Sequence, residues 1–393
     1  MGAIRLFLAW GVLLAHFDHE VLRHFGMQAN YIWAFNVIGG RAVLFFYVVS
    51  GFLISYVLHE KYPRNLTGTL AFYRARFLRI YPLWWVLLIA CLLLDTPPAQ
   101  HVPATLLPAS VLLGSDWIVA FWTFPQTYWL AFPASAEIGW TLGAELTFYL
   151  LAPWVLRSNR VALLFLLAAA ATRLFTIWAF PMHTPLNITM TYFFFPSTLV
   201  FFMLGHFGAV LHRRYSIKLG ASLMLLTLTI VILCSSRAGS VSDWKTHAAL
   251  VSFAAALPGI FAATKDNRIF NFLGDLTYPA YLIHSLIVSA LFWPLSLWNG
   301  IGSRTVNSVL PLIPSPSLAA ILLTGAFLLI VLCAAVLTHF AAERPARFLV
   351  GRILDLFVAV SGRFAQFIIK ASASDELPPA VGEAATSPLL RQL

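Results

Sequence analysis

Charged side chains are scarce in this sequence: Asp, Glu, Lys and Arg together make up 10% of its 393 residues, whereas hydrophobic residues make up 60%. Soluble globular proteins contain about 25% charged residues. The composition therefore excludes an ordinary soluble domain and predicts an integral membrane protein. Because the bilayer core offers no water to backbone groups, and the apolar runs are long and do not alternate, they must span as helices rather than as a barrel. We expect an all-α, polytopic helical bundle.

Cysteine is also rare. Cys91, Cys234 and Cys333 lie inside apolar stretches and lack the paired spacing of a disulfide framework or a zinc site, so we expect them to pack and expect no metal. Basic residues outnumber acidic ones, 25 to 15. They occur in short clusters between apolar runs and not on one basic face, which argues against nucleic acid as a partner.

The apolar runs predict about ten transmembrane helices, at 4–17, 41–58, 81–95, 140–156, 161–180, 192–211, 218–234, 247–264, 277–296 and 317–340. With the N-terminus in the cytoplasm, most Lys and Arg residues fall in cytoplasmic connections, as the positive-inside rule requires. Both termini are then cytoplasmic. The alternative for the first run is a secretory signal peptide, but His16, Asp18, His19 and Glu20 stand where small residues would form its cleavage site.

The regions between and after these spans differ in composition. Residues 95–138 are rich in Pro and aromatic residues, which predicts an outer-face lid or re-entrant segment, or simply an interfacial aromatic belt. We expect an integral membrane domain at 1–345 and a cytoplasmic surface helix at 346–370, where apolar and basic residues mix. The Ser-, Pro- and Ala-rich stretch 371–393 predicts a disordered tail.

Two ionisable residues interrupt the first apolar run. His16 follows Arg5 by eleven residues, or about three helical turns and about 16 Å, so the two side chains share one helix face. Ionisable groups at membrane depth are functional candidates because their burial is costly. A neutral imidazole there is able to act as a general base, although a lone histidine in an apolar helix is more often structural.

Two further sites carry charge near the membrane. Glu145 is the one charged residue of its span, and it is a candidate either for orienting His16 or for holding helices together. Arg74, Arg76 and Arg79 precede the third span, and guanidinium groups bind phosphate in bidentate fashion. The alternative is an ordinary basic cytoplasmic loop beside an anionic leaflet.

Several stretches together resemble the membrane-bound acyltransferase family 3, which includes many bacterial O-acetyltransferases of surface polysaccharides. Arg5 and His16 match its R-x10-H pattern. The later matches, in order, are FFYVVSGFLI (45–54), FYRARFLRIYP (72–82), WTLGAELTFYLLAP (140–153), YLIH (281–284) and ERP (343–345). The resemblance extends from residue 1 to about 345, and its strength lies in the shared order of these motifs.

The sequence also departs from the family pattern. Arg41, Ala42 and Val43 stand where many members have Gly-Val-Asp, so an acidic role does not carry over and Arg41 adds a positive group. Ala75 replaces one arginine of the R-R-x-x-R motif, which weakens the assignment of Arg74 but not that of Arg79. Thr141 replaces the usual serine and keeps a hydroxyl.

The resemblance implies transfer of an acyl group, expected to be acetyl, from cytoplasmic acyl-CoA to a hydroxyl of a carbohydrate or lipid-linked glycan. It implies a protein of the bacterial inner membrane whose partners are acyl-CoA, the glycan and membrane lipids. Arg5, Arg76, Arg79 and Arg74 would bind the CoA phosphates, while His16, aided by Glu145, would act as general base or carry the acyl group transiently.

The other positions that the motifs mark are expected to contact substrate, with Ser50 a candidate for assisting the oxyanion: Arg41, Ser50, Trp140 and His284. Two alternatives to this interpretation remain open at this point. The first is a transporter or flippase, for which intramembrane charges are equally natural, and the second is an acyltransferase that modifies a small molecule or a lipid.

Overall fold

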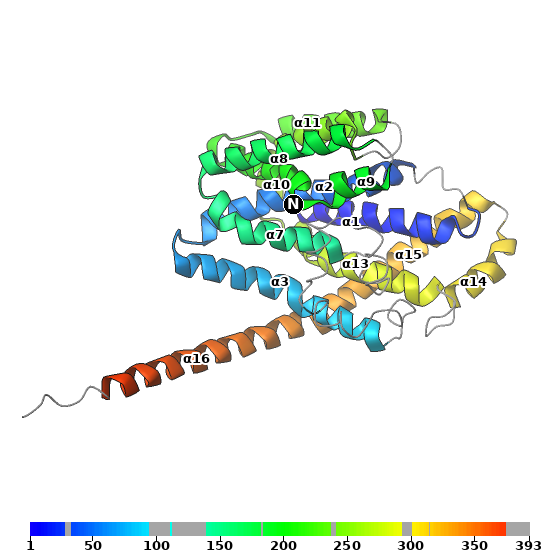
Figure 1. Cartoon of the computed structure of the whole chain (residues 1–393). Helices are drawn as coiled ribbons and strands as arrows, with labels where there is room; N and C mark the ends of the chain where they lie inside the picture. Colours follow the sequence, from blue (N-terminus) through cyan, green and yellow to red (C-terminus); the bar gives the residue numbers. More distant parts are fainter. Residues whose placement is uncertain are drawn as a thin grey trace, which may run out of the picture. The chain divides into compact units, whose positions relative to one another are not determined.

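The structure is a computed structural model that describes residues 1–27, 33–93, 111, 139–181, 184–236, 241–292, 301–313 and 315–374 (Figure 1). Every regular element in these ranges is helical. Their contacts divide the chain into two units, Met1–Arg347 and Phe348–Leu393. The predicted segment 95–138 lies outside the described residues apart from residue 111, as does the predicted tail beyond residue 374.

The longer helices follow the predicted apolar runs, and each of the ten predicted spans falls on one of them. In chain order these are α1 (Gly2–Phe17), α2 (Trp33–Lys61), α3 (Leu66–Leu93), α7 (Gly139–Val155), α8 (Asn159–Ala179), α10 (Phe195–Arg214), α11 (Leu219–Ser235), α12 (Trp244–Thr264), α13 (Arg268–Phe292) and α15 (Pro316–Thr338).

Shorter elements connect or extend them. They are η1 (Asp18–Leu22), α9 (Pro185–Ile188), η6 (Thr189–Phe193), α14 (Ile301–Val309), η7 (Leu310–Leu312) and η8 (His339–Glu343), and the chain continues into α16 (Arg344–Ser374). The predicted surface helix 346–370 falls within α16, which also includes the first residues of the predicted tail.

Several helices are long and apolar enough to cross a membrane. In the described part of the chain, five helical stretches meet both conditions: Gly39–Lys61, Asn159–Ala179, Pro185–Arg214, Trp244–Thr264 and Pro316–Val360. The protein is therefore an all-α membrane bundle, whereas the count of about ten spans stays a prediction. Cys234 and Cys333 are free thiols, and both are exposed on the surface of the bundle.

Helices α2 and α10 approach each other closely because glycine lines their contact. A Cβ atom built on Gly51 would lie 1.9 Å from the carbonyl oxygen of Phe202, and one built on Gly205 would lie 1.9 Å from that of Val48. Small residues let helix backbones approach in membranes, where packing replaces the hydrophobic effect between helices. Gly51 of the FFYVVSGFLI motif therefore serves packing, and it places the neighbouring Ser50 beside α7.

Helix α1 lies between α2 and α13, as Figure 1 shows. Its buried residues divide between two apolar clusters: Leu8 and Val12 join the larger one with α2, and Leu13 and Phe17 join a smaller one with α13 and α15. Both flanks of α1 are thus covered by protein, which explains how a helix can carry both Arg5 and His16.

Candidate active site

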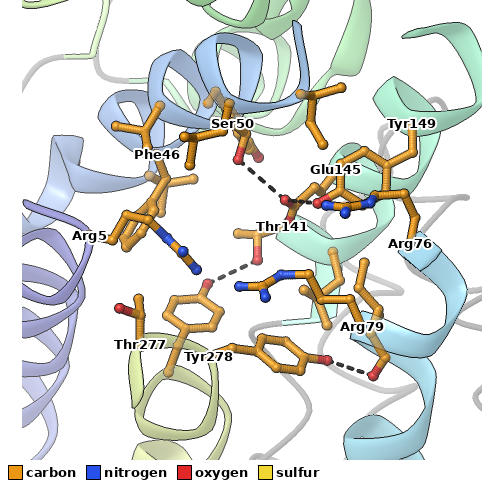
Figure 2. A pocket seen from close by; sticks show the side chains of 18 of the residues that line it. Arg5, Phe46, Ser50, Arg76, Arg79, Thr141, Glu145, Tyr149, Thr277 and Tyr278 are labelled. Atoms are coloured by element: carbon orange, nitrogen blue, oxygen red, sulfur yellow. Dashed lines mark hydrogen bonds between the residues drawn. The ribbon is translucent and has the colours of Figure 1, made fainter. Parts of the chain in front are cut away.

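A cavity of about 240 Å³ lies between five helices, α1, α2, α3, α7 and α13 (Figure 2). Its polar groups come from widely separated motifs: Arg5 from α1, Ser50 from α2, Arg76 and Arg79 from α3, and Glu145 from α7. Packing of the bundle therefore gathers five of the predicted site residues around one space.

Three arginines supply the positive charge of this cavity. The side chains of Arg5 and Arg79 point into it from opposite sides, and the charge of Arg79 acts on Arg5 (Figure 2). The guanidinium of Arg76 lies over the rings of Phe72 and Tyr149, at 5.6 and 5.7 Å.

Within the described residues, none of the three arginines donates a hydrogen bond from its side chain or forms a salt bridge. Their donors are therefore available to an anionic ligand with several oxygen atoms, the geometry that arginine binds best.

Glu145 is the one carboxylate among the described residues that line the cavity. It accepts hydrogen bonds from Ser50 Oγ at 3.2 Å and from the hydroxyl of Tyr149, one helical turn further along α7. The negative charge of Glu145 also attracts the guanidinium of Arg5. The carboxylate is thus fixed by two hydroxyls and partly balances the three arginines.

His16 lies next to His284 of α13. The Nδ1 atom of His16 is 3.2 Å from Nε2 of His284, and Nδ1 of His284 is 2.6 Å from the carbonyl oxygen of Tyr281. Since a carbonyl only accepts, His284 must carry its proton on Nδ1 and, when neutral, offers Nε2 as an acceptor. His16 then donates from Nδ1, which leaves the lone pair on its Nε2. When both rings are neutral, Nε2 is therefore the nitrogen of His16 that can accept a proton.

Tyr281 connects this histidine pair to the cavity. Its backbone carbonyl accepts from His284, while its side chain lines the cavity and its hydroxyl lies 3.0 Å from Oγ1 of Thr141. His16 itself does not line the cavity. Tyr281 is thus the residue that contacts both the histidine pair, through its backbone, and the cavity, through its side chain.

The sequence was compared with models of protein families, with known proteins and with solved structures. The family model described as an acyltransferase domain, of acyltransferase family 3, matches residues 1–340. The chain belongs to this acyltransferase family. It is also 28% identical, over 320 residues, to "Nodulation protein 10" of Rhizobium leguminosarum bv. viciae, covering 73% of this chain and 82% of that relative. No solved structure matches it.

Family membership makes the protein a membrane acyltransferase with an acyl donor and an acceptor. The resemblance noted in the sequence is therefore confirmed, and so is the enzyme class. Among the described residues, no group of three His, Cys, Asp or Glu side chains is placed to hold a metal ion.

Some family-motif residues lie away from the cavity. Arg74 is exposed on α3 and does not line it. Arg41 is fully buried and donates to Ser236 Oγ at 2.8 Å, and Trp140 packs on Phe193 with ring centroids 4.5 Å apart. Neither Arg41 nor Trp140 lines the cavity, so the structure gives both a place in helix packing.

Two expected pairings also differ in the structure. Glu145 was expected to orient His16, but it hydrogen bonds to Ser50 and Tyr149, whereas His16 pairs with His284. His284, for which we expect a substrate contact, does not line the cavity, and its Nε2 lies 3.2 Å from Nδ1 of His16. The Ser50 hydroxyl is engaged by Glu145, which leaves its expected oxyanion role without structural support.

Tyr149 and Tyr281 were not among the predicted site residues. Tyr149 stands four residues after Glu145, the spacing at which helix side chains meet, so the sequence did contain a signal for this contact. Tyr281 belongs to the YLIH motif, but nothing in the sequence shows that its hydroxyl reaches Thr141 of α7.

Proposed function

We propose that the protein transfers an acyl group, acetyl in the simplest case, from cytoplasmic acyl-CoA to a hydroxyl of a carbohydrate or lipid-linked glycan. We propose further that it resides in a bacterial inner membrane with both termini in the cytoplasm. The observation that carries the donor assignment is the convergence of Arg5, Arg76 and Arg79 on one cavity with no hydrogen-bond acceptor of their own among the described residues.

The three guanidiniums suit the phosphates of CoA. A nucleotide pyrophosphate presents several oxygen atoms on adjacent groups, and arginine binds such oxygens with two parallel hydrogen bonds. In the orientation predicted from the positive-inside pattern, Arg5 and the start of α3 lie toward the cytoplasm, where CoA is found. His16 lies about 16 Å further along α1, so α1 separates the phosphate site from the reacting thioester by a fixed length.

His16 then acts as the general base. Its Nε2 takes the proton of the acceptor hydroxyl while the hydroxyl oxygen attacks the thioester carbonyl. Collapse of the tetrahedral intermediate breaks the carbon–sulfur bond, and the imidazolium returns the proton to the departing thiolate. The products are the ester and free CoA. A positioned base contributes about 10²- to 10⁴-fold to such a reaction.

Glu145 belongs to the donor end in this proposal. Held by Ser50 and Tyr149, it faces Arg5 and limits the repulsion among the arginines while the cavity is empty. His284 positions His16 and selects its tautomer, the role that a second group commonly plays behind a catalytic histidine.

A test uses the purified full-length protein reconstituted in vesicles with acetyl-CoA and longer acyl-CoAs, and measures released CoA thiol. The change His16→Ala should lower release about 10²-fold or more while CoA still binds. The matched control is His24→Ala, because His24 is an exposed histidine shortly after α1. Wild-type release by the His16 variant would refute the base assignment, and no release from any acyl-CoA would refute the donor.

The acceptor is tested separately, by mass spectrometry of surface glycans and lipids from cells with and without the protein. Loss of an ester from a glycan is the expected result. An ester lost only from a lipid or a small molecule would replace the glycan by that alternative acceptor. The transporter alternative has no observation in its favour, since the family is one of acyltransferases.

A further inference from the structure

A second cavity, of about 230 Å³, shares none of its described lining residues with the first. We call it the basic cavity. Three segments that are distant in sequence form it: the end of α2 and the turn after it, the connection between α7 and α8, and the last turn of α10. Its polar lining residues are His59, Arg64, Arg157, Asn159, Arg213 and Arg214.

Among the described residues, no carboxylate lines the basic cavity. Arg157 donates to Oγ1 of Thr69 at 3.0 Å and to the carbonyl of Pro63 at 2.9 Å, and Arg213 donates to Oγ of Ser55 at 3.4 Å. These acceptors are neutral, so they hold the guanidiniums in place without cancelling their charge.

The four arginines of the basic cavity form no salt bridge within the described part of the chain. The negative charge of exposed Glu60 attracts the guanidinium of Arg213, whereas the positive charge of Arg64 repels it. Glu60 therefore offsets only part of the positive charge gathered here, and no ion pair within the described residues balances the rest.

Helix ends account for part of this charge but not for its convergence. Arg213 and Arg214 occupy the last turn of α10, where cations are ordinarily favourable. Asn159 instead begins α8, a helix of 21 residues, and Arg157 precedes it by two residues; the N-cap Ser158 accepts from the N–H of Val161, and the other N–H groups of the first turn point toward the N-terminus of the helix. A helix start and four arginines around one cavity together form an arrangement that suits a phosphate group.

We propose that the basic cavity binds a phosphate group, and that an anionic phospholipid headgroup supplies it. Two exposed aromatic residues support the lipid source. Trp154, 68% exposed, precedes Arg157 by three residues, and Tyr215, 61% exposed, follows Arg214 directly. Trp and Tyr gather where a membrane meets water, so these neighbours place the cavity at headgroup level. The proposal does not depend on the acyl donor or on His16.

The test is native mass spectrometry of the full-length protein in detergent, with phosphatidylglycerol, phosphatidylcholine and inorganic pyrophosphate as probes. The variant is Arg64→Gln with Arg214→Gln, since both side chains are exposed and make no hydrogen bond within the described residues. The control is Arg160→Gln with Lys218→Gln, which removes the same charge from exposed neighbouring positions outside the cavity.

We expect phosphatidylglycerol to bind in preference to phosphatidylcholine, and the cavity variant to weaken that binding roughly tenfold or more. The control should change it less than about twofold, and CoA binding should persist in both. Pyrophosphate binding that depends on Arg64 and Arg214, without lipid binding, would keep the phosphate site but replace its source by a soluble phosphate. Equal losses in variant and control, or no binding of either anion, would overturn the proposal.

Discussion

Two arginines on α3 provide the sharpest test of the donor site. Arg79 lines the first cavity, whereas Arg74, five residues earlier on the same helix, is exposed and does not. Replacing either by glutamine removes one positive charge from the same basic segment. If the cavity binds the CoA phosphates, only Arg79→Gln should weaken CoA binding strongly.

The expected size follows from the contacts that would be lost. A charge-assisted hydrogen bond contributes about 1.5–3 kcal/mol, which corresponds to roughly 10- to 150-fold in Kd. Part of this is offset, because Arg79→Gln also removes repulsion from Arg5 in the empty cavity. We therefore expect the lower end, about tenfold. Arg74→Gln should stay within about twofold, as for other exposed charges.

The assay is isothermal titration calorimetry of CoA into the purified protein, with 3′-dephospho-CoA as a second ligand. If Arg79→Gln weakens both ligands alike, the contact is to the pyrophosphate; if it weakens CoA alone, the contact is to the 3′-phosphate. Equal losses in the Arg74 and Arg79 variants would show a general charge effect and refute the clamp.

Three further changes test the packing and the site. Gly51→Ala should destabilise the protein by about 1–3 kcal/mol, because its Cβ would overlap the α10 backbone, while Gly40→Ala, with nothing within 4 Å, should be neutral or stabilising in thermal unfolding. His284→Gln should lower kcat roughly 10-fold or more with KM unchanged, since His16 would lose the partner that selects its tautomer; an unchanged kcat would remove His284 from the mechanism. If the first cavity binds the CoA phosphates, Glu145→Gln should tighten CoA binding by about 0.5–1 kcal/mol, because a negative charge leaves that cavity; calorimetry showing weaker binding would contradict this.

The membrane-embedded helical fold could be predicted from composition and local pattern alone. Apolar runs long enough to span must be helical because a bilayer offers no partner to free backbone groups, and this constraint acts on each segment separately. The family motifs likewise stood in the sequence in their order. The sequence also predicts that Arg5, Arg76 and Arg79 lie close to one another, because the positive-inside rule places all three on one face of the membrane.

The partner of His16 could not be predicted in this way. His284 lies 268 residues away along the chain, and α1 meets α13 through a close approach in which Gly2 lies against the backbone of Phe270. Local periodicity states which face of a helix carries a residue but not which helix will cover that face. Glu145 was a reasonable candidate by charge, yet α7 turns it toward Ser50 and Tyr149.

The sequence by itself thus determined that this protein lies in a membrane, which segments form its helices, and which ionisable residues are candidates for a site. These depend on interactions along one segment or between one segment and the bilayer. The tertiary structure decided which of those residues lie together. Three arginines line one cavity, His284 contacts His16, and four other arginines line a second cavity. Such contacts depend on how closely two helices approach each other. Gly51 of α2 and Gly205 of α10 allow a close approach, but only the packing of α2 against α10 shows that these glycines face each other's helix.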